Sequence, residues 1–175
     1  MAVPAQKFRE VVFQMLYSHD IGRATDESMV DLLSHELAVT KKVVRDAQDR
    51  VHQICAHQED IDAKITATSH SYAFERIQSV ERNILRLGVY ELLFDQSIPF
   101  KVVMAEASRL AKKFATKESA SFVNAILDAI YKANMGEPID NTIIQQSAQE
   151  LSLIEKISHE ASQELKAPIK EAEEE

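Results

Sequence analysis

The chain has 175 residues with only three glycines, four prolines and no tryptophan, which suits a single helical domain and disfavours a sheet with glycine-rich turns. Its net charge of -8 excludes a strongly basic nucleic-acid binder, and its one cysteine, Cys55, excludes an internal disulfide. No apolar run approaches the roughly 18 residues of a membrane span. The start MAVPAQKF has no apolar segment of signal-peptide length, so we expect a cytoplasmic protein.

The negative charge is concentrated at the C-terminal end. Residues 1–135 contain 17 Lys and Arg against 18 Asp and Glu, whereas residues 136–175 contain 3 against 10. Within residues 101–135, six basic residues outnumber three acidic ones. A weakly basic face there suits nucleic-acid binding that is shared with a partner, because proteins that bind unaided carry stronger basic stripes.

Apolar residues recur at helical spacing from the N-terminus onward. After Pro4 this spacing predicts a first helix, which ends before Gly22. Thr25 and Asp26 are then expected to cap a second helix that runs to Leu37.

A third helix is expected from the cap residue Thr40 to Cys55. Next, Glu59, Asp60 and Asp62 lie in the first turn of a short helix, where the dipole favours carboxylates. They form a metal site only with further ligands, and none stands nearby. The six histidines also lack a His-x-x-x-His pair, so we expect no metal and no cofactor.

Residues 80–134 show the clearest periodicity and predict three consecutive amphipathic helices. A short aromatic helix or turn at 69–78 leads into them, and Ser79 is expected to cap the first. Pro99 separates the first from the second, and the polar segment 116–119 separates the second from the third. Such short connections favour antiparallel neighbours, so the expected fold is an all-α bundle.

Several strings in this region resemble the ordered motifs of a known family. They are VERNILRLGVYELL, IPFKVVMAEASRLAKKF and SFVNAILD, preceded near the N-terminus by FREVVFQMLYSHD. Together they are similar to the NusB family of transcription antitermination proteins, over roughly residues 7–134. The resemblance implies a single-domain bundle of about seven helices. It also implies a non-catalytic factor that, with NusE, binds boxA-type single-stranded RNA, notably in ribosomal RNA transcripts, and helps RNA polymerase to resist termination.

The resemblance also implies which residues hold RNA, at the first helix, before the central stretch and near the start of its third helix. These are Lys7, Arg9, Arg76, Lys117, Glu118, Ser119 and Phe122. Two alternatives stay open: Lys7 and Arg9 as ordinary solvated helix charges, and Phe122 as a core residue that continues the apolar stripe. Ala5 and Gln6 stand where the family often has arginines, which predicts weaker binding that depends less on salt.

By the same resemblance, the partner protein docks against Tyr17, Glu81 and Arg82. Tyr17 has the alternative role of a half-buried tyrosine with a hydrogen-bonded hydroxyl. Arg82 and Arg86 are four residues apart and therefore share a helical face.

After Gly136, where the family motifs have ended, an amphipathic helix is expected over about 141–166 and a disordered acidic end beyond Pro168. We therefore divide the chain into a helical domain, 1–135, and an acidic extension, 136–175. The apolar stripe of the extension needs a partner surface. It can fold back on the domain, which we favour, pair with its copy in a homodimer, or cover the RNA-binding face.

No motif for catalysis is present: the sequence has no phosphate-binding glycine loop, nucleophile elbow or zinc-protease helix. An enzyme is therefore not expected. Two alternatives to an antitermination factor remain. One is a helical adaptor without RNA selectivity. The other is a module like the N-terminal domain of some ribosomal RNA methyltransferases, which would need roughly 200 further residues for a methyl-donor domain.

Overall fold

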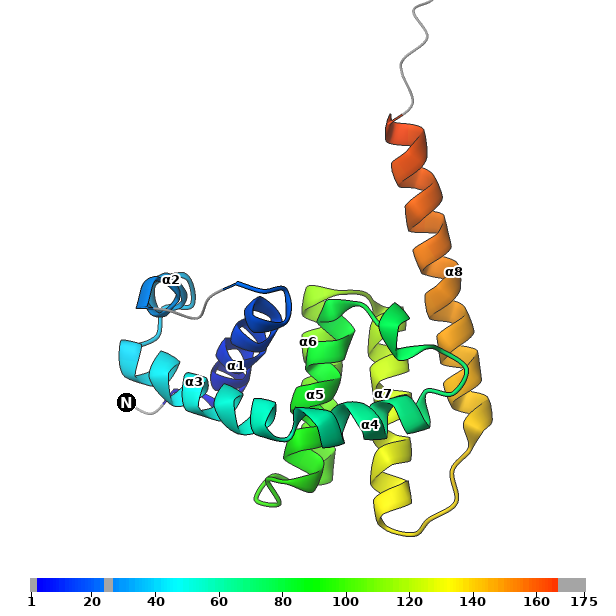
Figure 1. The fold of residues 1–175 in the computed structure, drawn as a ribbon, viewed down its shortest axis with the longest axis horizontal. Helices are drawn as coiled ribbons and strands as arrows, with labels where there is room; N and C mark the ends of the chain where they lie inside the picture. Colours follow the sequence, from blue (N-terminus) through cyan, green and yellow to red (C-terminus); the bar gives the residue numbers. More distant parts are fainter. Residues whose placement is uncertain (1–2, 24–26, 167–175) are drawn as a thin grey trace, which may run out of the picture.

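The structure, a computed structural model, describes residues 3–23 and 27–166, which form eight α-helices, one 3-10 turn and no strand. The helices are α1 (Ala5–Asp20), α2 (Glu27–Glu36), α3 (Lys41–Ala56), α4 (Gln58–Thr68), α5 (Ser79–Leu93), α6 (Phe100–Phe114), α7 (Lys117–Asn134) and α8 (Asn141–Lys166), with the 3-10 turn η1 at Phe74–Arg76. The expected all-α bundle of seven helices with an added C-terminal helix is confirmed (Figure 1). The predicted caps at 25 and 26 and the predicted disordered end after 168 lie outside the described residues.

Local signals explain where the helices begin. The side-chain oxygens of Thr40, as predicted, and of Thr116, in the predicted polar segment 116–119, accept backbone N–H groups at the starts of α3 and α7. The expectation that Ser79 caps α5 is wrong, because Gln78 precedes the helix and Ser79 is its first residue. The Ser79 hydroxyl instead accepts a hydrogen bond of 3.2 Å from Arg82.

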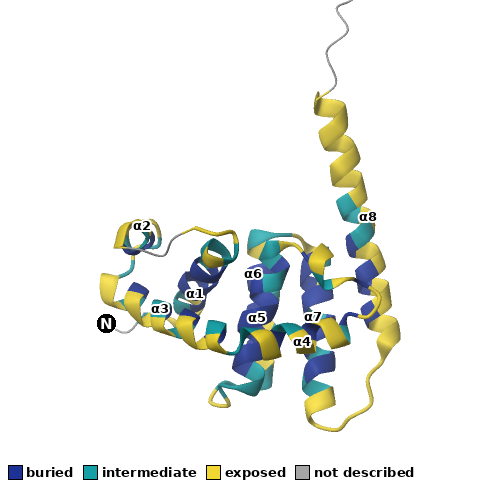
Figure 2. Ribbon diagram, in the orientation of Figure 1, coloured by how far each residue is buried: buried dark blue, intermediate teal, exposed yellow. Residues whose placement is uncertain are grey.

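The centre of the core is α5, which packs against α1, α4, α6 and α7 and is buried around almost its whole circumference (Figure 2). Gly88 explains how closely α7 approaches it. A Cβ atom at this position would come within 2.8 Å of Leu127 Cδ1. Because a glycine stands there, the two helices meet without that clash, and the start of α7 is held beside the start of α5.

The last helix has two different halves. After Gly136, which ends the α7 segment with φ of 72°, the chain turns back and α8 packs along α7. Ile144, Ala148 and Leu151 in its first half are buried, whereas its last turns extend beyond the bundle and are exposed (Figures 1 and 2). The fold-back hypothesis therefore describes the first half of α8, and the second half has an open apolar stripe.

Candidate nucleic-acid and partner interface

The basic residues of α1 differ in how far they are available to a ligand. Arg9 Nε donates to Glu91 Oε1 at 2.8 Å, and only 8% of the Arg9 side chain is exposed. Burial raises the pKa of Glu91, although the neighbouring Arg9 charge opposes that shift. Because the buried guanidinium is paired with Glu91, the prediction that Arg9 binds RNA is wrong. Lys7 is half-buried and pairs with no carboxylate among the described residues.

A second cluster joins α1 to α6. Glu10 accepts from Arg109 Nη1 at 2.6 Å and from Lys113 Nζ at 2.9 Å. Burial raises the pKa of Glu10, but the hydrogen bonds from Lys113 and Arg109 more than offset this, so that it lies below its ordinary value. Arg109 also pairs with Glu106 at 2.9 Å. These two cations of the basic segment 101–135 are therefore held by internal carboxylates.

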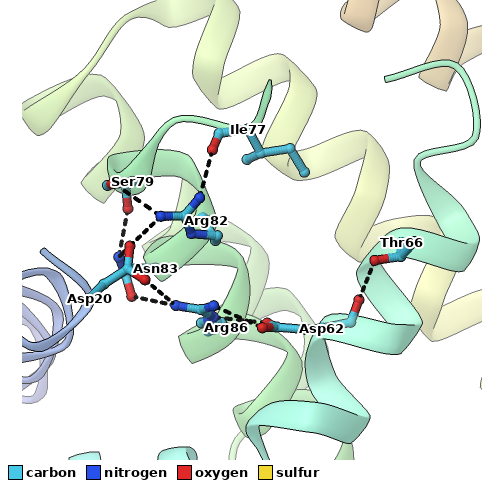
Figure 3. A network of polar contacts seen from close by, with 8 residues as sticks. All are labelled: Asp20, Asp62, Thr66, Ile77, Ser79, Arg82, Asn83 and Arg86. Carbon is cyan, nitrogen blue, oxygen red and sulfur yellow. Dashed lines mark hydrogen bonds and ion pairs between the residues drawn. The ribbon is translucent and has the colours of Figure 1, made fainter. Parts of the chain in front are cut away.

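A third cluster joins α1, α4 and α5 (Figure 3). Asp20 accepts hydrogen bonds from Arg82 at 2.6 Å, Asn83 at 3.1 Å and Arg86 at 2.9 Å. Arg86 also forms a bidentate pair with Asp62, both contacts being 2.8 Å. Burial raises the pKa of Asp20, yet the hydrogen bonds from Arg82 and Arg86 outweigh it and the pKa is lowered. The predicted shared face of Arg82 and Arg86 is confirmed.

The third cluster also holds Arg82. Its side chain is 19% exposed, and its two terminal nitrogens bond to Asp20, Ser79 and the carbonyl of Ile77. The guanidinium thus joins the end of α1 to the start of α5. These internal acceptors occupy the terminal nitrogens of Arg82, whereas its Nε has no acceptor among the described residues. The partner contact of Arg82 stays a prediction.

Glu81 and Ser119 meet where α5 and α7 begin. Ser119 Oγ donates to Glu81 Oε1 at 2.5 Å, and both residues are buried, at 1% and 4% exposure. The prediction that Ser119 touches RNA is wrong, because its hydroxyl points inward. Oε2 of Glu81 is also buried and has no donor among the described residues. The partner contact of Glu81 stays a prediction, and this unfilled acceptor is part of its evidence.

Phe122 is a core residue. Its exposure is 0%, and its ring lies 5.3 Å from that of Tyr72, centroid to centroid. It shares the inner face of α7 with Val123 and Ile126, as its place in the apolar stripe allows. The stacking role on RNA is therefore wrong, and the core alternative is correct.

An exposed polar edge remains where α6 ends and α7 begins. We define the α6–α7 edge as Lys112, Lys117, Glu118, Ser121 and Asn124, which line an open hollow of about 330 Å³. The Lys117 side chain is 85% exposed, with its nearest carboxylate, Glu118, at 4.0 Å. The Asn124 side-chain oxygen is buried without a donor among the described residues. Lys112 and Asn124 were not predicted; their polar positions on the outward face, opposite the apolar stripes, were the available signal.

Tyr17 opens onto an apolar groove rather than onto the α6–α7 edge. The Tyr17 ring lies 6.4 Å from that of Phe13, which packs 4.9 Å from Phe114. The groove has a volume of about 460 Å³, and Leu32 on its rim is 53% exposed. Both the half-buried and the partner-facing roles of Tyr17 are compatible with this place, and its partner contact stays a prediction.

Arg76 lies beside α8. Its guanidinium stands 4.6 Å from the centre of the Tyr72 ring, and Nη2 is 3.4 Å from Ser152 Oγ and 3.9 Å from Glu155. The residue is exposed, so its predicted RNA contact is sterically open. Any RNA that reaches Arg76 must pass close to α8.

Residues 3–23 and 27–166 contain no group of three or more His, Cys, Asp or Glu side chains placed to hold a metal ion. Of the acids near the start of α4, Asp62 is paired with Arg86. None of the described helices combines the length and apolar character needed to cross a membrane.

The sequence matches known proteins over most of its length. Residues 6–132 match the model of the NusB family. The chain is 35% identical over 128 residues to transcription antitermination protein NusB of Chlamydia pneumoniae, covering 73% of this chain and 80% of that protein. It is 38% identical over 123 residues to NusB of Geobacter sulfurreducens, covering 70% and 89%.

Solved structures match as well. T. maritima NusB superposes with a TM-score of 0.64 at 36% identity, covering 75% of this chain and 93% of that one. A chain from a crystal structure of antitermination factors NusB and NusE in complex with dsRNA superposes with a TM-score of 0.63 at 32% identity, covering 73% and 96%. The family match ends at residue 132, so α8 lies beyond it.

Proposed function

The chain belongs to the NusB family, and from this premise we propose that it is a non-catalytic RNA-binding factor in transcription antitermination. Together with NusE it binds boxA-type single-stranded RNA, notably in ribosomal RNA transcripts. It acts in the cytoplasm, as part of the assembly that makes RNA polymerase resist termination. Its mechanism is assembly: it positions RNA and a second protein without making or breaking a covalent bond.

The strongest support is a relative that has been solved with NusE and with a double-stranded RNA. The matching chain in the complex of NusB, NusE and dsRNA is 32% identical to this one, and 96% of its length is covered. The two chains share a fold at 32% identity over 73% of this chain, and this likeness supports NusE and RNA as the two classes of partner.

The α6–α7 edge supplies the phosphate-binding chemistry of the proposal. Lys112 and Lys117 are exposed, and the first backbone N–H groups of α7 lie at the positive end of the helix dipole. Lys7 and Arg76 are kept as further RNA contacts. Glu118 and, from α8, Glu150 line the same hollow and would select against a phosphate placed too close to them.

The need for a partner follows from charge. Residues 1–135 are nearly neutral, and internal carboxylates hold several of their arginines. Few cations are left to attract RNA, so binding by this chain alone is weak. If RNA strengthens binding of NusE, thermodynamic linkage requires NusE to strengthen binding of RNA by the same factor.

The proposal is tested by fluorescence anisotropy with a boxA RNA and a scrambled RNA of equal length. Each is measured with and without NusE, at about 50 mM and about 200 mM salt. The expected result is a preference for boxA that grows when NusE is added, and weaker binding at the higher salt concentration. Equally weak binding of both RNAs under all conditions would contradict the proposed function. It would favour the alternative of a helical adaptor without RNA selectivity.

A further inference from the structure

A second groove lies between α8 and the bundle. Its volume is about 440 Å³, and it is open to solvent along one side. The inner wall includes Glu81 and Ser119, at the starts of α5 and α7. The outer wall is one side of α8, with Ile154, Ser158 and Ser162. We call it the α8 groove.

One residue that lines the α8 groove, Glu81, has an acceptor without a donor. Glu81 is 4% exposed and one of its oxygens is filled by Ser119, but Oε2 has no partner among the described residues. Burying a carboxylate oxygen without a donor is strongly unfavourable, because the oxygen loses its hydrogen bonds to water and no protein group replaces them. A ligand that brings an N–H donor would remove this deficit.

The charges of the α8 groove select the kind of donor. Among the described residues, the charged or titratable ones that line it are Glu81, Glu155 and His159, and none of the described lysines or arginines does so. Glu155 accepts from the Tyr72 hydroxyl at 2.7 Å, and Arg76 stands 3.9 Å from it outside the lining. Two carboxylates without a lining cation repel a phosphate and attract an ammonium or guanidinium group.

The walls also suit the long stem of such a side chain. Three of the residues that line the groove are apolar: Val80 of α5, and Leu151 and Ile154 of α8. Lysine and arginine bury their methylene stems against apolar surface while the charged end finds its partner. A basic side chain therefore suits both the apolar and the acidic residues that line the groove.

We infer that the α8 groove receives a lysine or arginine side chain of NusE, so that α8 forms a second wall of the partner-docking site. This occupant rests on the proposed function. The outer wall lies beyond the family match at residues 6–132, so it is an addition to the family region of the chain.

The test compares two lysine substitutions on the full chain by calorimetric titration with purified NusE. Ser158→Lys places a cation in the groove, from an exposed position whose replacement leaves the bundle intact. Gln149→Lys makes the same charge change on the opposite, exposed side of α8. Ser158→Lys is expected to weaken NusE binding at least about tenfold by like-charge repulsion, and Gln149→Lys to change it less than about twofold.

A second variant tests the inner wall. Glu81→Gln keeps an acceptor for Ser119 but removes the negative charge, and we expect several-fold weaker binding of NusE with a smaller dependence on salt. Circular dichroism melting curves check that each variant is folded.

The outcomes separate the two proposals. If the wild-type chain binds NusE and Ser158→Lys binds equally well, the α8 groove is not the docking site and the proposed function stands. If Ser158→Lys and Gln149→Lys weaken NusE binding equally, the α8 groove is likewise not the docking site, because the effect then comes from net charge. A wild-type chain that does not bind NusE overturns the proposed function and the occupant with it.

Discussion

The polar face of α1 and the α6–α7 edge both carry cations, but they use them differently. On α1, Arg9 is buried against Glu91, and Glu10 holds Arg109 and Lys113. At the α6–α7 edge, Lys117 is 85% exposed and its nearest carboxylate is 4.0 Å away. The first region holds helices together, whereas the second is open to a ligand.

The difference shows that a count of basic residues overstates what a ligand can reach. An arginine has five donors in a rigid fork and can bind two carboxylates at once, as Arg86 does between Asp20 and Asp62. Such arginines are suited to joining helices. The cations that can attract RNA are the exposed ones without a close carboxylate, such as Lys117 at the α6–α7 edge.

The most severe way to break an internal cluster is Arg86→Ala. Asp20 and Asp62 would lose their shared cation at positions only 12% and 22% exposed. We expect the free energy of unfolding to fall by about 3–5 kcal/mol, measured by urea denaturation. As a control, Arg45→Ala breaks an exposed pair with Glu27 and should cost less than about 1 kcal/mol. Similar losses in both variants would contradict the structural role of the cluster.

Arg9→Met separates stability from RNA binding on α1. The variant leaves Glu91 buried without its cation, so unfolding should become easier by about 3 kcal/mol. Because Arg9 does not face solvent, RNA affinity of the folded protein should stay within about twofold of wild type. Anisotropy titrations at a temperature where the variant is folded measure this affinity. A large loss of RNA affinity would show that Arg9 contacts RNA.

The converse experiment is the double substitution Lys112→Ala and Lys117→Ala, which tests whether the α6–α7 edge binds RNA. RNA affinity should fall about tenfold, and the slope of log affinity against log salt should decrease by about 1.4, since each phosphate contact to a single strand contributes about 0.7. Unfolding free energy should change by less than about 0.5 kcal/mol. Lys42→Ala, on the distant helix α3, is the matched control and should leave the slope unchanged.

The smallest effect concerns pH. Asp20 has a pKa below its ordinary 3.8 in the folded state, where hydrogen bonds from Arg82 and Arg86 outweigh burial. A lowered folded pKa stabilises the protein above the unfolded pKa, and this contribution is lost as pH falls through the folded pKa. Asp20→Asn should therefore be less stable near neutral pH but lose less on acidification below about pH 4. Urea denaturation across that window measures it; parallel curves for both proteins would exclude Asp20 as a contributor.

The helices could be predicted because their signals are local. Apolar spacing, Thr40, Thr116 and Pro99 act within one or two turns of the chain, and they marked the helix boundaries correctly. The cap at Ser79 failed by a single residue. An apolar stripe likewise indicated that α8 needs a surface, and its first half finds one on α7.

The candidate site could be predicted only in part. The exposed positions of Lys117 and Arg76 agree with an RNA-facing role, whereas Arg9, Ser119 and Phe122 proved to be interior residues. Their burial depends on distant partners: Glu91 is 82 residues from Arg9, and Glu81 is 38 residues from Ser119. No local pattern reports such pairs.

The amino-acid sequence by itself determined the helices, the order of the motifs and the membership of the NusB family, because periodicity, capping and motif spacing are properties of neighbouring residues. The tertiary structure alone decided which cations are free, which aromatic ring is core and where α8 lies. Those features depend on contacts between segments far apart in the chain. A side chain that looks solvated along its own helix is buried once another helix brings it a carboxylate.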